Sequence, residues 1–183
     1  MIGYQAARRE HIPQILKLQE ANLLSKLPPE RQGNGFVTTA ITPQQYEQLI
    51  EQGDLFMAVE GEELRGYVVS SSWQFLSQWP IFAHMVTLFD QFTFDGERMT
   101  VDNSYQYGPI CVDENHRGRG IVQGLYEFAR KSMAARYPYG LTFINKRNPR
   151  SFVAHTRKLP LNVLIEFGFN GNEYYFLGFK TRD

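Results

Sequence analysis

This chain of 183 residues lacks several features that define whole classes of protein. Cys111 is its only cysteine, so neither an intrachain disulfide nor a cysteine-based metal site can form. The four histidines show no ligand spacing, and we expect no bound metal. Lysine plus arginine and aspartate plus glutamate balance at 19 each, without the basic excess typical of a nucleic-acid-binding protein.

Long apolar runs are also missing. No stretch reaches the roughly 18 to 20 apolar residues that a membrane span requires, and the first ten residues lack the apolar region of a signal peptide. We therefore expect a soluble cytoplasmic protein with neither a membrane nor a nucleic acid as partner. With 43% hydrophobic residues the chain can bury one good core, so one domain over residues 1–183 is expected.

What the sequence does contain is an alternation of strand and helix patterns. Helices are expected at residues 10–24 and 42–51, where Thr42 and Pro43 form a helix start. Strands are expected at residues 2–7, 55–59, 65–71, 107–112 and 141–145. Asn170 and Gly171 both tolerate positive φ, which predicts a hairpin between strands at 162–169 and 172–179.

The most informative segment joins the strand ending at Val112 to an amphipathic helix expected at 121–136. Two glycines between them let the backbone approach an anion closely. Amides at a helix N-terminus point outward, where the helix dipole favours negative charge. The segment therefore predicts a phosphate cradle, formed by Arg117, Gly118, Arg119, Gly120, Ile121 and Val122.

Two familiar phosphate loops do not fit this segment. A P-loop requires lysine and then serine or threonine after its last glycine, where this chain has Ile121 and Val122. A dinucleotide fingerprint requires a third glycine and, some 20 positions on, an acidic residue, but Gly124 stands one position late and the stretch near residue 140 offers no acid.

Residues 115–120 instead resemble the pyrophosphate loop of the Gcn5-related N-acetyltransferases. The pattern there is Gln or Arg, two residues, Gly, one residue, then Gly or Ala. Asn115 departs from it at the first position, which weakens one contact to the phosphates but leaves the loop geometry intact.

A second segment is similar to the same family. Asn148 follows the strand at 141–145 and is suited to cap a helix that starts at Pro149. In the family, this asparagine reaches the pantetheine arm, and the residue seven positions on is often a tyrosine that faces the thioester sulfur. His155 occupies that position here. The resemblance thus implies that Asn148 and Ser151 bind the coenzyme and that His155 protonates the departing thiolate, although a packing or capping role would also suit this histidine.

The order of elements resembles the family fold over nearly the whole chain. The resemblance implies an α/β (α+β) fold whose central mixed, mostly antiparallel sheet contains a splayed pair of strands and is flanked by helices. Pro109 agrees, because a proline cannot donate to a strand ladder and so indicates a bulge or an unpaired edge. An ordinary edge strand would explain it equally well. In the family, backbone groups of the splayed strand bind the pantetheine arm. The resemblance implies that Ile110, Cys111 and Val112 do so here.

The activity that the resemblance implies is transfer of an acetyl group from acetyl-CoA to a primary amine of a small molecule or peptide. Some members carry a glutamate base on this strand, and the matching position here is Gln106, which can orient a water but cannot take a proton. Tyr107 would face the site only if a bulge shifted the register. Glu97 and Asp102 are further candidates for the base.

Two alternative functions, neither of them enzymatic, stay open. The missing glutamate and Asn115 favour a non-catalytic acyl-CoA-binding or regulatory module on the same fold. A protein-interaction scaffold would instead use residues 73–103, an aromatic-rich insertion where the family has a tight hairpin. Extra helices on the chain's own core, a substrate-pocket wall and a homodimer interface are alternative uses of this insertion.

Overall fold

The structure is a computed structural model that describes residues 1–182, and at residues 33 and 34 it describes the backbone alone. A seven-stranded sheet has the order β1-β2-β3-β6-β7-β9-β8. Strands β6 and β7 pair in parallel, whereas β1 with β2, β2 with β3, β7 with β9 and β8 with β9 are antiparallel. The strands are β1 (Ile2–Ala6), β2 (Leu55–Glu60), β3 (Glu63–Ser71), β6 (Ser104–Val112), β7 (Tyr139–Asn145), β8 (Asn162–Phe169) and β9 (Asn172–Lys180).

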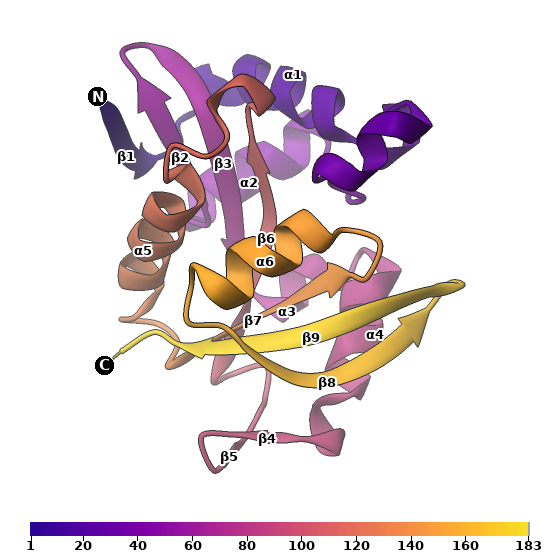
Figure 1. Ribbon diagram of the computed structural model, residues 1–183. Coiled ribbons are helices and arrows are strands. Elements are labelled where there is room, and N and C mark those ends of the chain that lie inside the picture. The colour runs from indigo at the N-terminus through magenta and orange to yellow at the C-terminus, as the bar shows by residue number, and fades with distance from the viewer. Residues whose placement is uncertain (183) are drawn as a thin grey trace. The chain divides into compact units, whose positions relative to one another are not determined.

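The helices lie between these strands along the chain, singly or in pairs (Figure 1). They are α1 (Ile12–Asn22), α2 (Pro43–Gln52), α3 (Trp73–Leu76), α4 (Pro80–Thr87), α5 (Ile121–Met133) and α6 (Pro149–Arg157). The predicted mixed, mostly antiparallel fold is confirmed. Two compact units make up the chain, one of Met1–Ser70 with Gly108–Ala129 and the other of Ser71–Tyr107 with Arg130–Asp183.

In the first unit, local chemistry fixes the start of α2 as the sequence predicts. The Thr42 hydroxyl accepts a hydrogen bond from the Gln45 amide at 3.2 Å, and the Gln45 side chain accepts one from the Thr42 amide at 2.9 Å. This reciprocal capping box satisfies two amides that a helix start leaves without partners. Gly53 then ends the helix in the left-handed conformation, with φ of 73°.

Buried polar groups connect the helices of this unit to its strands. The Gln19 side chain bonds the backbone of Ile41 through both its oxygen and its nitrogen, each at 3.0 Å. The Tyr46 hydroxyl donates to the same Gln19 oxygen at 2.7 Å and lies 3.2 Å from the Tyr67 hydroxyl. Burial raises the pKa of both tyrosines, so these groups stay neutral donors. The network fixes α1 and α2 against β3.

The second unit is built on an aromatic core that includes the insertion. Its short elements α3, α4, η4 (Phe89–Gln91), β4 (Thr93–Phe94) and β5 (Glu97–Arg98) follow β3 in the chain. The Trp73 indole donates to the Ser104 hydroxyl at 3.1 Å. Extra packing on the chain's own core is therefore the use that the structure shows for much of the insertion, and the buried cluster contains Trp73, Leu76, Phe82, Met85, Leu88, Phe89, Met99, Tyr139, Leu141, Phe167, Tyr174 and Phe176.

The parallel pairing of β6 with β7 stops early. Three pairs are formed, and the last joins Gln106 to Leu141. β7 nevertheless continues to Asn145 alongside β9. On β6, Gly108 follows with φ of 107°, and Pro109 has no amide hydrogen to donate. The pairs of β6 with β7 that the structure describes therefore end at Gln106.

Several predicted boundaries shift. The strand before the glycine loop begins at Ser104 rather than Tyr107, and the following helix ends at Met133 rather than Arg136. The first helix occupies Ile12–Asn22, with a separate 3-10 turn at Arg9–His11 before it. The hairpin of β8 and β9 has its turn at Asn170 and Gly171, with φ of 48° and 77°, as predicted.

Candidate functional site

The glycine loop of the first unit has the backbone that an anion site requires. Gly118 and Gly120 have φ of 83° and 79°, a region that residues with a Cβ rarely adopt. Apart from the two chain neighbours of each glycine, no described residue has a heavy atom within 4 Å of the position that a Cβ would take. The backbone is thus open to a ligand at both glycines.

The amides of residues 118–123 form the donors of this loop. None of them donates a hydrogen bond to another residue in the described part of the chain, and the first helical bond here is from the Gly124 amide to the Gly120 carbonyl at 3.0 Å. These amides stand at the N-terminus of α5, a helix of 13 residues. They form a row of donors where the helix dipole favours negative charge.

The two loop arginines are engaged by other parts of the first unit. Arg117 donates to the Asn22 side-chain oxygen of α1 at 2.7 Å and to the Val112 carbonyl at 3.4 Å. Arg119 binds both carboxylate oxygens of Glu60, at 2.8 and 3.3 Å. The hydrogen bond from Arg119 lowers the pKa of the Glu60 carboxyl to about 2. These bonds tie the loop to α1 and β2, and the predicted contact of both cations with the phosphates stays a prediction.

The start of the loop is ordered by Asp113. Its carboxylate accepts from the Asn115 amide at 3.0 Å and lies 3.0 Å from the His116 ring nitrogen Nδ1. The Asp113 amide in turn donates to the Arg65 carbonyl of β3 at 2.9 Å. These bonds build the short turn η5 (Glu114–His116) that leads the chain from β6 into the glycines.

Strand residues before the loop can offer backbone groups only. Cys111 is buried, its thiol points to the Leu18 carbonyl at 3.6 Å, and burial raises its pKa to about 12. It is therefore an inert packing residue. Val112 and Ile121 are also buried, while Ile110 and Val122 are half-buried. Any contact of Cys111 or Val112 with a coenzyme would be made by main-chain atoms.

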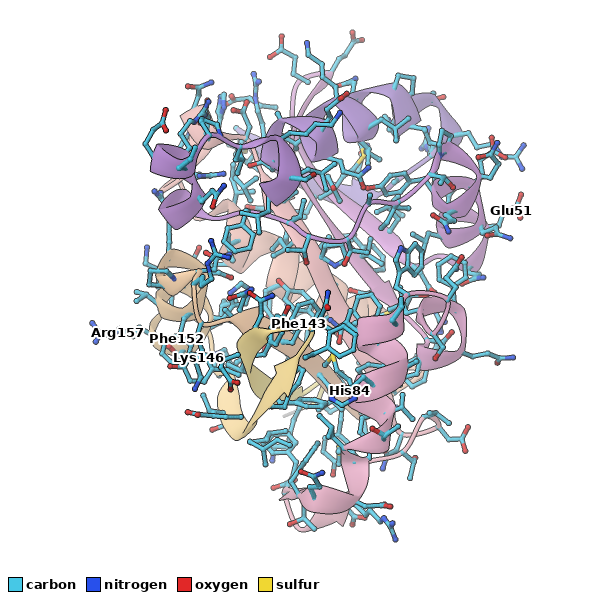
Figure 2. All side chains as sticks on the ribbon, turned by 90° about the vertical axis from the view of Figure 1, so that its right-hand side faces the viewer. Glu51, His84, Phe143, Lys146, Phe152 and Arg157 are labelled. Atoms are coloured by element: carbon cyan, nitrogen blue, oxygen red, sulfur yellow. The ribbon has the colours of Figure 1, made fainter. Side chains whose placement is uncertain are left out.

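In the second unit, α6 begins as predicted. Asn148 accepts from the Ser151 amide at 3.3 Å, and Pro149 occupies the first helical position. On the β9 side of this helix, the Phe152 ring packs against Tyr175 in a tilted arrangement with centroids 4.3 Å apart, and Lys146 lies over the same tyrosine at 5.2 Å. Figure 2 labels Phe152 and Lys146 close together beside the β8–β9 hairpin. These contacts fix the helix that carries His155.

His155 faces inward from α6 and is 4% exposed. Its Nδ1 lies 2.8 Å from the Ser151 carbonyl and 3.4 Å from the Ser151 hydroxyl. The ring meets Tyr107 of β6 edge to face, with centroids 6.0 Å apart. Burial lowers the pKa of His155, which favours the neutral imidazole. The structure thus brings three predicted residues, His155, Ser151 and Tyr107, into one cluster.

Gln106 forms the last described pair of β6 with β7. Its side-chain nitrogen donates to the Tyr107 carbonyl at 3.0 Å and lies 3.5 Å from the Thr142 hydroxyl on β7. Its side-chain oxygen is buried and accepts no hydrogen bond from the residues that the structure describes. An acceptor without a donor at such a position is costly unless a ligand or water satisfies it.

Sequence reasoning missed the residues that hold the loop arginines. Asn22 and Glu60 lie 95 and 59 positions from their partners, and no local pattern marks them. Within residues 1–182, no group of three or more histidine, cysteine, aspartate or glutamate side chains is arranged to hold a metal ion. No helix in the same range has the length and apolar character to cross a membrane.

No protein-family model and no curated protein matches this sequence. Solved structures do. An N-acetyltransferase from Staphylococcus aureus superposes with a TM-score of 0.66 at 15% identity, covering 100% of this chain and 99% of that one. The chain has the fold of the Gcn5-related N-acetyltransferases.

Two further structures with this acetyltransferase fold extend the likeness. The putative acetyltransferase yncA from Salmonella typhimurium, solved with its cofactor acetyl-CoA, gives a TM-score of 0.65 at 11% identity, over 100% of this chain and 95% of that chain. A ribosomal-protein-alanine N-acetyltransferase from Brucella melitensis gives 0.60 at 16% identity, over 97% and 99%. At identities this low, these superpositions show the fold alone.

Proposed function

We propose that this protein transfers an acetyl group from acetyl-CoA to a primary amine of a small molecule or peptide. The observation that carries the proposal is the row of amides at residues 118–123, which have no acceptor within the described chain. Two glycines with positive φ hold that row open at the start of α5. Coenzyme A presents a diphosphate, the kind of anion that such a helix start binds.

The remaining contacts follow from the groups that each element presents. Acetyl-CoA supplies a thioester, an acyl group already activated for transfer to an amine. We assign the backbone groups of Ile110, Cys111 and Val112 to the pantetheine amides, because Pro109, just before them, has no amide hydrogen with which to pair to a neighbouring strand. Asn148 and Ser151, at the start of α6, are assigned to the same arm.

The acceptor must lose a proton before it can attack. An alkylamine with a pKa of about 10.4 is only about 0.04% neutral at pH 7, which costs about 4.6 kcal/mol. A peptide α-amine with a pKa near 8 is about 10% neutral and therefore needs far less help. The buried oxygen of Gln106 could accept a hydrogen bond from a water that carries the proton away. A protein acceptor is named for the Brucella melitensis structure, which supports including peptides among the substrates.

The proposal is tested by thiol release. Purified protein is supplied with acetyl-CoA and, separately, with small amines, polyamines, amino acids and peptides that have free N-termini. We expect release of coenzyme A thiol that depends on one class of amine, with the acetylated amine as the second product. Gly120→Asp should abolish both.

Binding of acetyl-CoA without turnover across the whole panel would instead support a non-catalytic acyl-CoA-binding module. The absence of both acetyl-CoA binding and turnover would favour an interaction scaffold. Calorimetric titration with coenzyme A separates these outcomes, because it reports binding independently of chemistry.

A further inference from the structure

His155 is held in one tautomer by the helix that carries it. Its Nδ1 lies 2.8 Å from the carbonyl oxygen of Ser151. A carbonyl oxygen can only accept a hydrogen bond, so Nδ1 must carry the ring proton. In the neutral ring, Nε2 then bears the lone pair, and it can take a proton but has none to give.

The surroundings favour the neutral ring. His155 is buried, and burial lowers its pKa, with only partial opposition from the bond to Ser151. From β6, the titratable residue against the ring is Tyr107. On and beside α6 itself, the charged groups are the exposed Arg150, Arg157 and Lys158. The described carboxylates of this unit are all exposed and none pairs with His155, namely Asp90, Asp95, Glu97, Asp102, Glu166 and Glu173.

Given the proposed acetyltransferase function, on which this step rests, we infer that His155 Nε2 takes a proton from the attacking amine and then returns it to the departing sulfur. A tyrosine at this place in related sequences is a donor from the outset. His155 becomes a donor only after it has acted as an acceptor, because its one ring proton is committed to Ser151.

The protons balance over the cycle. The amine loses its first proton to solvent and attacks through its lone pair, which forms the N–C bond. That bond makes the nitrogen acidic, and its surplus proton moves to Nε2. As the C–S bond breaks, the same proton passes from Nε2 to sulfur, so the thiol leaves neutral and His155 regains its starting tautomer. One ring atom can serve both partners because nitrogen and sulfur are joined to the same carbon at that stage.

The tautomer can be measured without turnover. In protein labelled with ¹⁵N-histidine, the His155 ring at pH 7 should show one protonated nitrogen, Nδ1, and one unprotonated nitrogen, Nε2. His155→Phe assigns the signals by their loss. Ser151→Ala should leave the pattern unchanged, because it keeps the carbonyl that accepts from Nδ1. A proton on Nε2 at pH 7 would overturn the inference.

The chemistry is tested by replacing acceptor and donor capacities separately. His155→Phe keeps an aromatic ring against Tyr107 but handles no proton, and His155→Tyr can donate but is a negligible base at neutral pH. Both should lose kcat by about 100-fold, within the range for positioned acid–base groups, with little change in KM for acetyl-CoA. The acid limb of the wild-type kcat profile, where activity falls as Nε2 becomes protonated below pH 6.5, should be absent from both.

A matched control is His84→Phe. His84 also packs against an aromatic ring, that of Phe169 at 5.2 Å, but on α4. The His84→Phe variant should have the same kcat as the wild-type protein. If His155→Tyr instead retains most of the wild-type activity, His155 is a donor alone and the inference fails while the acetyltransferase function stands. Absence of thiol release from the wild-type protein itself would overturn both.

Discussion

The ring of Tyr4 on β1 occupies the space beside Gly124 of α5 that any other residue would fill with its Cβ. A Cβ at residue 124 would lie 1.9 Å from Cζ of Tyr4, far inside van der Waals contact. The helix can therefore approach β1 closely only with glycine at this position. Since α5 carries the amide row at residues 118–123, this contact helps to place the candidate diphosphate site.

A double-mutant cycle tests that relationship. Gly124→Ala alone should lower the free energy of unfolding by about 1 to 2 kcal/mol, because overpacking against Tyr4 outweighs the better helix propensity of alanine. In a Tyr4→Ala background, the same change should stabilise the protein by up to about 1 kcal/mol. Urea denaturation of the four proteins gives the signs. Additive effects would mean that the two residues do not compete for space.

The diphosphate site is tested at Gly120 with Gly96 as its matched control. Both glycines have similar positive φ, 79° and 77°, and both have open space where a Cβ would stand. Aspartate at either position should cost about 1 kcal/mol of stability from backbone strain. Only Gly120→Asp should weaken coenzyme A binding, by at least about tenfold, because it places a negative charge beside the phosphates. Calorimetric titration measures this, and equal affinity of the two variants would remove the loop from the site.

The capping role and the predicted ligand-binding role of Asn148 can be tested separately. Asn148→Ala removes the acceptor of the Ser151 amide and should cost about 1 kcal/mol of stability. Thr42→Ala removes the equivalent cap of α2 at a similar cost. If Asn148 also holds the pantetheine arm, only its variant should raise KM for acetyl-CoA. If KM for acetyl-CoA rises in neither variant, Asn148 has a structural role alone.

The Glu60–Arg119 pair gives the loop an acid-sensitive anchor. The hydrogen bond from Arg119 lowers the pKa of the Glu60 carboxyl from 4.5 to about 2. A depressed pKa stabilises the folded state above pH 4.5, and this contribution is lost as pH falls from 4.5 toward 2. Glu60→Gln should therefore show a smaller drop in urea midpoint between pH 7 and pH 3. Because the pair is exposed, high salt should shrink the difference between the two proteins.

Much of the fold could be predicted because its determinants are local. Thr42 and Asn148 cap helices through side chains that reach amides three residues on. Asn170 and Gly171 form the hairpin turn because both tolerate positive φ. The backbone conformation of the glycine loop was equally predictable, since it depends on which residues have no side chain. Boundaries moved where the last turns depend on packing, as at the end of α5.

The sequence by itself therefore determined the order of elements, the helix starts and the loop backbone, all set by residues within a few positions of one another. Tertiary structure alone decided which side chains of the candidate site have partners elsewhere in the protein. It paired Arg117 with Asn22 and Arg119 with Glu60, and it buried the aromatic insertion in the core. It also placed Tyr107 against His155 and left the Gln106 oxygen buried at the last described pair of β6 with β7. Such contacts join residues tens of positions apart, and burial sets their protonation, so no local pattern in the chain encodes them.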